Sequence, residues 1–390
     1  MAGIDEKVFA REIIISFPDN PDMTDITGEN IVSESLKYEE AICDGNFKFG
    51  GCISSKFEIS LLNVNADDLI GKRISVNLKE HFYGNKIFPQ ANLSPAESLY
   101  PGSYFKFVSN SNFFVGTIDS AKRQKDKKIT KIVAYDDLYT IGNINCYEWF
   151  ENICLYNPTV TVGTLFEQVL DNPFINMSKA YNSSGIKANA TTALSLTTAL
   201  ARDIRDGELL ASELLNNLCE LIGNFGYISG GTFILQGLSD EATEISSYKD
   251  LDYEDYVTNP FNVILCKYNK DKWHWSTTTS ATSLNPSTYS IDNSLSMCND
   301  NKSVAVNLCN GIWPVLGTGT GNKYQYRPFK CVINDPSIKL GAKVKIPTGD
   351  SVVPYVESYV FKRSIEGING MLVTISADGD KQQIGNYEIN

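Results

Sequence analysis

The chain has 390 residues, of which 42% are hydrophobic and 21% charged. This length and apolar content suffice for about two to four domains with cores of their own, which excludes a disordered chain. The formal net charge of -12 argues against a nucleic-acid surface, because phosphate binding needs a stripe of lysine and arginine, and the one basic cluster, at residues 122–131, is typical of an exposed hairpin.

The first third of the chain, to about residue 138, predicts a series of short strands. Apolar and polar residues alternate in each of them, which is the period-2 pattern of a half-buried strand. Turn signals such as Gly50-Gly51, Gly84-Asn85 and Pro101-Gly102 separate them. Strands at this spacing favour a barrel or sandwich. The alternating segments are residues 12–17, 53–62, 72–78, 104–108, 113–121 and 129–134.

The middle third is predicted to be α+β. Residues 162–170 predict a short helix, and in residues 212–222 the leucines fall on one helical face that ends at Gly223. Residues 225–235 predict a hairpin that turns at Gly230-Gly231. The stretch 182–198 is rich in serine, threonine, alanine and asparagine and is expected to be a loop.

Strand patterns return near residue 259. The predicted elements are strands at residues 261–268, 326–333, 342–346, 355–363 and 371–375, and a helix at residues 304–312. Trp273 and Trp275 lie on the same side of any strand that contains both. Such a pair is typical of a core or a subunit interface, and it could also form a stacking platform for a sugar.

Nine cysteines are scattered along the chain without a C-x-x-C pair, and only His81 and His274 could complete a metal site. A zinc site is therefore not expected, and the thiols are interpreted as small buried hydrophobic groups. A glycine-rich turn could bring Cys43 and Cys52 opposite each other, although free thiols are favoured there too.

No catalytic constellation stands out. Neither histidine lies in an H-E-x-x-H pattern, and the acidic groups Asp136-Asp137, Glu39-Glu40 and residues 250–255 are interpreted as solvated acids at turns or exposed ends. A glycosidase carboxylate pair is not excluded by sequence. We therefore predict no enzyme, and no catalytic, cofactor-binding or metal-binding residue.

Two segments have compositions typical of ligand-binding loops. The sequence GTGTGN at residues 317–322 lacks the G-K-[ST] ending of a nucleotide loop, and a flexible loop is expected. Residues 19–25 are rich in side chains with oxygen atoms, as calcium-binding loops are. Pro21 and the spacing break the EF-hand pattern, however, so an acidic turn is expected.

Residues 31–64 contain a specific sequence pattern. The segments S-E-S-L and E-E-A-I-C are followed by G-x-x-x-F-G-G-C, with Gly50, Gly51 and Cys52 at its end, and then by an alternating strand. This combination resembles the N-terminal domain of hub proteins from bacteriophage tails and baseplates and related injection systems, including the N-terminal part of tail-associated lysins. Residues 115–141, which end in A-Y-D-D-L-Y-T-I, resemble the last hairpin of the same domain.

The later parts of the chain extend the resemblance in the family's order. Residues 212–235 resemble the hub's middle domain, and residues 289–293, 334–350 and 370–380 resemble its C-terminal barrel. The chain departs from the family at Gly341-Ala342, where Gly-Asp is common, and residues 267–284 match no part of it. These departures affect the domain edges.

The resemblance implies an α+β, mostly β fold, in which two β-barrel-like modules flank an α+β middle region and pack with it. The expected domains are residues 1–138, 139–258 and 259–390. It also implies a homotrimer that adapts a six-fold tail tube to a three-fold tip. Expected partners are a tail tube or distal tail protein, a spike, fibre or lytic tip protein, and DNA that passes through the lumen without specific binding.

The expected location is the virion, after assembly in the host cytoplasm. The acidic N-terminus does not fit a secretory signal, and no apolar run reaches the roughly 20 residues of a membrane span. The alternative function is a cell-wall hydrolase or a carbohydrate-binding tail-tip protein. The patterns do not distinguish a contractile from a flexible tail.

Overall fold

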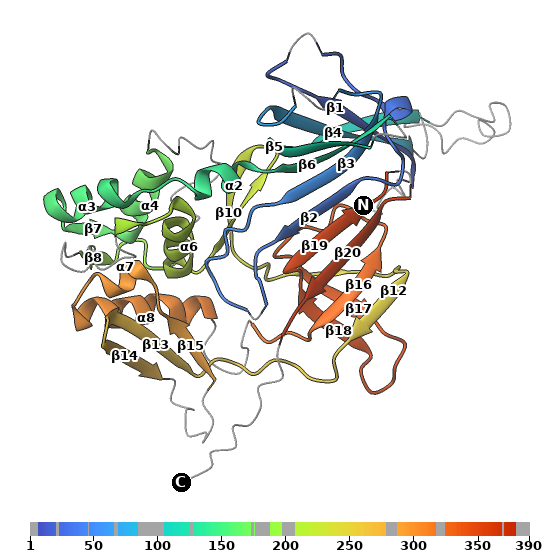
Figure 1. Ribbon diagram of the computed structural model, residues 1–390. Coiled ribbons are helices and arrows are strands. Elements are labelled where there is room, and N and C mark those ends of the chain that lie inside the picture. Colours follow the sequence, from blue (N-terminus) through green and yellow to red (C-terminus); the bar gives the residue numbers. More distant parts are fainter. Residues whose placement is uncertain are drawn as a thin grey trace.

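The fold is α+β and mostly β, as predicted, and the helices lie beside the sheets (Figure 1). It is given by a computed structural model. The model describes residues 7–20, 23–45, 47–65, 69–84, 105–124, 128–172, 175, 188–196, 207–277, 287–316, 324–368 and 370–379. The predicted turns at Gly84-Asn85 and Pro101-Gly102 and the glycine-rich segment 317–322 lie wholly or partly outside these residues.

Six strands form the N-terminal part. They are β1 (Lys7–Ser16), β2 (Lys37–Ala41), β3 (Lys56–Leu62), β4 (Arg73–Gly84), β5 (Phe105–Gln124) and β6 (Ile129–Tyr135), with a 3-10 turn η1 (Gly28–Asn30) between β1 and β2. The predicted strands are confirmed, except that two of them belong to one long strand, β5. Polar residues 109–112 interrupt the alternation of β5, yet they pair with β4 next to a register shift. The sequence did not indicate β2, because Tyr38 is its one buried residue.

In the described part of the chain, ten strands form one sheet in the order β1-β4-β5-β6-β3-β2-β19-β20-β16-β12. Its second half comes from β12 (Asp250–Tyr253), β16 (Phe329–Ile333), β19 (Lys362–Glu366) and β20 (Leu372–Ala377). Strand β2 pairs with β3 on one side and with β19 on the other. The N-terminal and C-terminal strands are therefore hydrogen-bonded into one surface (Figure 1).

Two three-stranded sheets lie outside the large sheet. One joins β11 (Ala242–Glu244), β17 (Lys343–Pro347) and β18 (Tyr355–Tyr359), and the other joins β13 (Val263–Asn269), β14 (Lys272–Thr277) and β15 (Thr288–Ile291). The predicted strand 355–363 is divided into β18 and β19, because the chain leaves one sheet at Val360 and enters the other. The helices α7 (Ser294–Met297) and α8 (Lys302–Leu316) contact β13, and α8 confirms the predicted helix.

The middle part holds α2 (Asp137–Gly142), α3 (Tyr147–Tyr156), α4 (Val162–Leu170) and α6 (Ala211–Ile222), followed by the hairpin β9 (Phe225–Ser229) and β10 (Thr232–Gln236). The predictions of α4, α6 and the hairpin are confirmed, and Gly223 ends α6 with a φ of 68°. The expected loop at 182–198 is wrong in its described part, because β8 (Ala193–Ser195) pairs there with β7 (Thr159–Thr161) and buries Leu194.

Asp136 is buried, which corrects the expectation that Asp136-Asp137 is a solvated pair. Its side chain is the N-cap of α2 and accepts from Leu138 N at 3.0 Å, from Ser54 Oγ at 2.8 Å and from Ser55 N at 2.8 Å. Burial raises the pKa of Asp136 to about 6, although these hydrogen bonds oppose the shift. Asp137 is also engaged, in an ion pair with Arg73. The two carboxylates therefore fix the start of α2.

The glycine pair of the N-terminal motif is required by close packing. A Cβ atom on Gly51 would lie 1.9 Å from the Ile42 carbonyl oxygen. Gly50 has a φ of 102°, and a Cβ there would lie 2.6 Å from the Asn216 carbonyl oxygen on α6. Only glycine tolerates both the backbone angle and the contact. The pair lets the loop after β2 lie directly on α6.

We predict that Gly51→Ala lowers the free energy of unfolding by about 3 kcal/mol or more, because the added methyl group must displace backbone atoms. Gly28→Ala is the matched control, since a Cβ at Gly28 meets nothing within 4 Å. Urea unfolding of both variants measures the difference. Equal stability of the two variants would refute this account of the glycine pair.

All nine cysteines lie within the described residues, and they are buried and free. This confirms their interpretation as buried groups. The sulfur that Cys52 contacts is that of Cys219, at 3.6 Å, whereas the Cys43 thiol points to the Lys48 carbonyl oxygen. Within the described ranges, no helix is long and apolar enough to cross a membrane.

Candidate functional site

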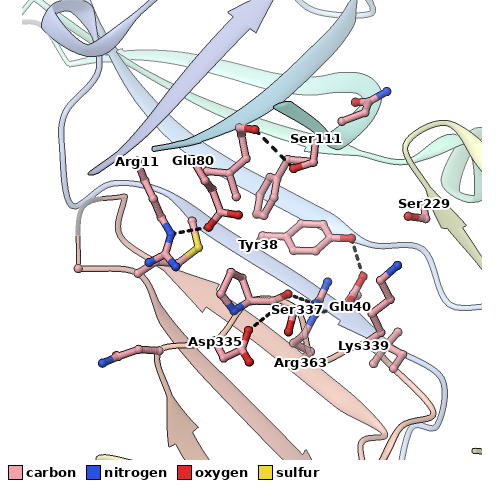
Figure 2. A pocket seen from close by; sticks show the side chains of 18 of the residues that line it. Arg11, Tyr38, Glu40, Glu80, Ser111, Ser229, Asp335, Ser337, Lys339 and Arg363 are labelled. Carbon is pink, nitrogen blue, oxygen red and sulfur yellow. Dashed lines mark hydrogen bonds and ion pairs between the residues drawn. The ribbon is translucent and has the colours of Figure 1, made fainter. Parts of the chain in front are cut away.

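A cleft of about 880 Å³ lies where the N-terminal and C-terminal strands meet. Figure 2 shows that its labelled side chains come from the large sheet, from the loop that contains Asp335, Ser337 and Lys339, and from the β9–β10 hairpin through Ser229. The lining combines charged and polar side chains with apolar ones such as Leu78, Phe113 and Met371. The cleft therefore brings together parts of the chain that are far apart in sequence.

A buried ion pair crosses the junction of β2 and β19. Glu40 and Arg363 are direct cross-strand neighbours, and Arg363 Nε lies 2.5 Å from Glu40 Oε1. Their side chains are 8% and 12% exposed. Arg363 Nη1 also donates to the carbonyl oxygens of Pro336 at 3.0 Å and Ile338 at 2.8 Å. One guanidinium thus links β2 and β19 to the loop between β16 and β17, which lines the cleft.

Tyr38 completes this network. Its hydroxyl donates to Glu40 Oε2 at 2.6 Å, and its ring packs on Phe113 with centroids 5.1 Å apart. Burial raises the pKa of Tyr38 well above its usual value, and the charge of Glu40 adds to the shift. Tyr38 therefore remains a hydrogen-bond donor, and both oxygens of Glu40 are engaged. The expectation that Glu39-Glu40 is a solvated pair is wrong for Glu40.

A second ion pair lies between β1 and β4. Arg11 and Glu80 are also cross-strand neighbours, and Arg11 Nε donates to Glu80 Oε1 at 2.9 Å. Of the other charged residues at the cleft, Asp335 accepts from Ser337 N at 2.8 Å, and Lys249 and Lys339 add positive charge to the lining. The carboxylates of the cleft are thus committed to arginines or to a turn. This arrangement favours holding the strands together over proton transfer.

We predict that Glu40→Gln lowers the free energy of unfolding by about 3 kcal/mol, because it leaves the buried Arg363 charge without its counter-ion. Glu39→Gln on the same strand is the control. Glu39 pairs with Lys37 at 2.7 Å, but both side chains are 42% exposed, so a change below about 1 kcal/mol is expected.

Urea unfolding compares these two variants with the double variant Glu40→Met/Arg363→Met, which removes both charges. The double variant should be less destabilised than the sum of its single changes. If Glu40→Gln and Glu39→Gln behave alike, the pair between β2 and β19 does not stabilise the fold as described.

The two histidines lie in separate strands. His81 in β4 lies 3.2 Å from Glu12 Oε1, and burial lowers the pKa of His274 in β14. The residues that the structure describes contain no group of three or more His, Cys, Asp or Glu side chains that could hold a metal. Asp250 and Asp252 are exposed, as expected, on β12. Of residues 19–25, Asp19 accepts from Arg73 N at 3.0 Å, and residues 21 and 22 are outside the described part.

Trp273 and Trp275 lie on β14, an edge strand of the β14-β13-β15 sheet. They are 50% and 53% exposed, so they are not core residues. The alternate residue Ser276 accepts from Trp313 Nε1 of α8 at 2.7 Å, so α8 covers the opposite face of the sheet. The two indoles therefore share the open face, as their spacing predicted.

A second cleft, of about 700 Å³, lies between the loop that follows β2, α6 and β15. Glu220 at its base is 4% exposed and is bonded by Lys48 Nζ at 3.1 Å and by Asn293 Nδ2 at 2.7 Å. Burial raises the pKa of Glu220, and these two partners oppose the shift. Sequence reasoning missed both clefts, because their charged partners are separated by long stretches of chain.

No family model matches the chain, and no curated protein sequence matches it. Solved structures do. The tail protein from Neisseria meningitidis MC58 has a TM-score of 0.51 at 11% identity, with 95% of this chain and 97% of that one covered. The 43 kDa tail protein of prophage MuSo2 from Shewanella oneidensis has a TM-score of 0.52 at 10% identity, with 95% and 98% covered. The predicted resemblance is confirmed for the fold: this chain has the fold of phage tail proteins.

Proposed function

We propose that the chain is a structural subunit of a bacteriophage tail tip or baseplate, or of a related injection device, and that it acts there as the hub. The observation that carries the proposal is the fold likeness to two tail proteins, one of them from a prophage, over 95% of the chain and at least 97% of theirs. A likeness over the whole length supports a common role better than one shared domain would. Identity is only 10–11%, so the argument is one of architecture.

The proposed assembly is a homotrimeric ring. Residues 1–138 and 259–390 supply β modules, residues 139–258 supply the α+β middle, and three chains with two modules each present six contacts to a six-fold tube. Closed cyclic symmetry lets identical subunits assemble without open-ended growth. The pairing of β2 with β19 supports this proposal, because it holds the two modules at a fixed spacing.

The proposed neighbours are a tail tube or distal tail protein on one side and a spike, fibre or lytic tip protein on the other. DNA would pass through the ring without specific binding, since a net charge of -12 disfavours retention of phosphates. Assembly would take place in the host cytoplasm, and the mature location would be the virion. We propose no enzymatic step for this chain. Large complementary surfaces suffice for such a role.

We predict a trimer of three times the 43.2 kDa chain mass, measured by light scattering at high protein concentration, and a three-fold ring in particle images. The N-terminal and C-terminal modules should superpose and alternate around the axis. A chain that stays monomeric both alone and with a purified tail-tube protein would contradict the hub proposal. If the two modules have different topologies, they cannot present six equivalent contacts. The proposed match to a six-fold tube would then be wrong, even if the chain forms a trimer.

A second candidate function, carbohydrate binding at the tail tip, is favoured by one observation. Trp273 and Trp275 expose about half of their surface on one open sheet face. Alongside them, Lys267 and Asp292 form an ion pair of 3.4 Å that could bond to hydroxyl groups. Exposed aromatic rings with a polar border suit a ligand that has one apolar and one polar side.

We predict that soluble peptidoglycan fragments quench the tryptophan fluorescence of the chain if this second function holds. The double variant Trp273→Ala/Trp275→Ala should lose the saturable quenching, because it removes the platform. Val352→Ala, at a side chain that is 85% exposed elsewhere, is the control and should keep it. Absence of saturable quenching in the unchanged chain rules out the sugar platform for these fragments and leaves the hub proposal untouched.

A further inference from the structure

Two thiols from distant parts of the chain are in contact beneath the glycine pair. Cys52 Sγ lies 3.6 Å from Cys219 Sγ, across 167 residues of sequence. Cys52 precedes β3, and Cys219 lies on α6. The contact therefore joins the loop that follows β2 to the helix on which this loop lies.

The surrounding contacts fix the position of both sulfurs. Cys52 N donates to Asn216 Oδ1 at 2.8 Å, one helical turn before Cys219, and Cys52 forms an isolated parallel bridge with Gly226. A Cβ atom at Gly226 would lie 2.6 Å from Cys52 Sγ, so the thiol is held against bare backbone. The Cys52 side chain is thus directed inward at α6, where Cys219 is its neighbour.

We propose that Cys52 and Cys219 form a site of covalent modification, at which an intramolecular disulfide closes when the protein meets a small-molecule disulfide. A disulfide bond is about 2.0 Å long, so the sulfurs, now 3.6 Å apart, must approach by about 1.6 Å. The bond would link the loop covalently to α6. This inference does not depend on the role in a phage tail.

The reaction is thiol–disulfide exchange. The Cys52 thiolate attacks one sulfur of the small disulfide, which forms a mixed disulfide and releases one small thiolate. The Cys219 thiolate then attacks the Cys52 sulfur, which forms the protein disulfide and releases the second small thiolate. In total, two protein thiols lose two electrons and two protons, and the small disulfide is reduced to two thiols.

Accessibility selects this pair over the other thiols. Cys52 is 8% exposed, whereas Cys219 is fully buried, so Cys52 is the thiol of the pair that attacks the small disulfide first. A second pair of interacting thiols, Cys266 and Cys309, is less accessible, because both of its members are 0% exposed. Burial raises the pKa of the Cys219 thiol well above its usual value. The exchange is therefore slow and proceeds through local opening of the loop.

The test uses the full chain and cystamine as the small disulfide. After incubation and removal of the reagent, the protein is unfolded without reductant, alkylated and weighed intact. We expect seven alkylated thiols instead of the nine of the reduced chain, that is, nine minus two, and a protein mass lower by about 2 Da before alkylation. Peptide mapping should join the fragments that contain Cys52 and Cys219, and reduction should restore all nine thiols.

Two variants define the outcome. Cys43→Ser removes a buried thiol outside the pair and should still lose two thiols on oxidation, whereas Cys219→Ser should form no internal bond and at most a mixed disulfide at Cys52. The oxidised chain should melt at a temperature about 3 °C or more above that of the reduced chain, since the bond closes a long loop.

Three results would overturn the proposal. Nine alkylated thiols after prolonged exposure would show that the pair does not react. A linkage that maps to Cys266 and Cys309 in place of Cys52 and Cys219 would show that contact and accessibility do not select the site. A crosslinked chain with a lowered melting temperature would show that the loop and α6 are not already placed for the bond.

Discussion

The pairing of β2 with β19 is the interaction on which the rest of the structure depends. It is the point at which strands from the two ends of the chain become one sheet, and closing so long a loop costs considerable chain entropy. Backbone ladder bonds offset part of this cost, and the buried pair of Glu40 and Arg363 fixes the register. A slip of β2 by one residue against β19 would place Glu40 and Arg363 on opposite faces of the sheet, so the ion pair could not form.

The segment that follows β2 carries this constraint into the middle of the chain. Phe47 stacks on Tyr324 with centroids 5.1 Å apart and lies 6.2 Å from Phe225, so its ring touches both the C-terminal part and the first strand of the hairpin. Lys48 reaches Glu220 on α6, and Gly50 N donates to Asn224 O at 3.0 Å. Residues 37–52 therefore contact all three predicted regions. This is a physical reason for the specific pattern of glycine, phenylalanine and cysteine in so short a stretch.

Local patterns predicted the elements that depend on local chemistry. The helix α6 and its stop at Gly223 follow from leucine spacing and from a glycine that tolerates a positive φ, and the β9–β10 hairpin follows from Gly230-Gly231. Strand β2 was not predicted, because a half-exposed strand with the sequence KYEEA gains its stability from partners far away in sequence. The signal that could have indicated α2 was present, since Asp136 precedes a leucine-containing turn as an N-cap would.

The cleft was beyond sequence reasoning for the same reason. Arg11, Glu80, Glu40 and Arg363 pair only after the sheet has formed, and each appears in the sequence as an ordinary charged residue on a strand. The strand register alone determines which oppositely charged residue lies next to each of them. Asp136 was misjudged because acidic residues at strand ends are commonly solvated, whereas here serine hydroxyls from the segment before β3 replace the water.

The free edges of the sheets differ in a way that bears on assembly. Strand β12, at one end of the large sheet, exposes Asp250 and Asp252, and such charges discourage the addition of a further strand from another molecule. Strand β14, at the edge of the small sheet, exposes two indoles. Edges protected by charge suit a surface that stays in solvent, whereas aromatic side chains are enriched where proteins bind partners.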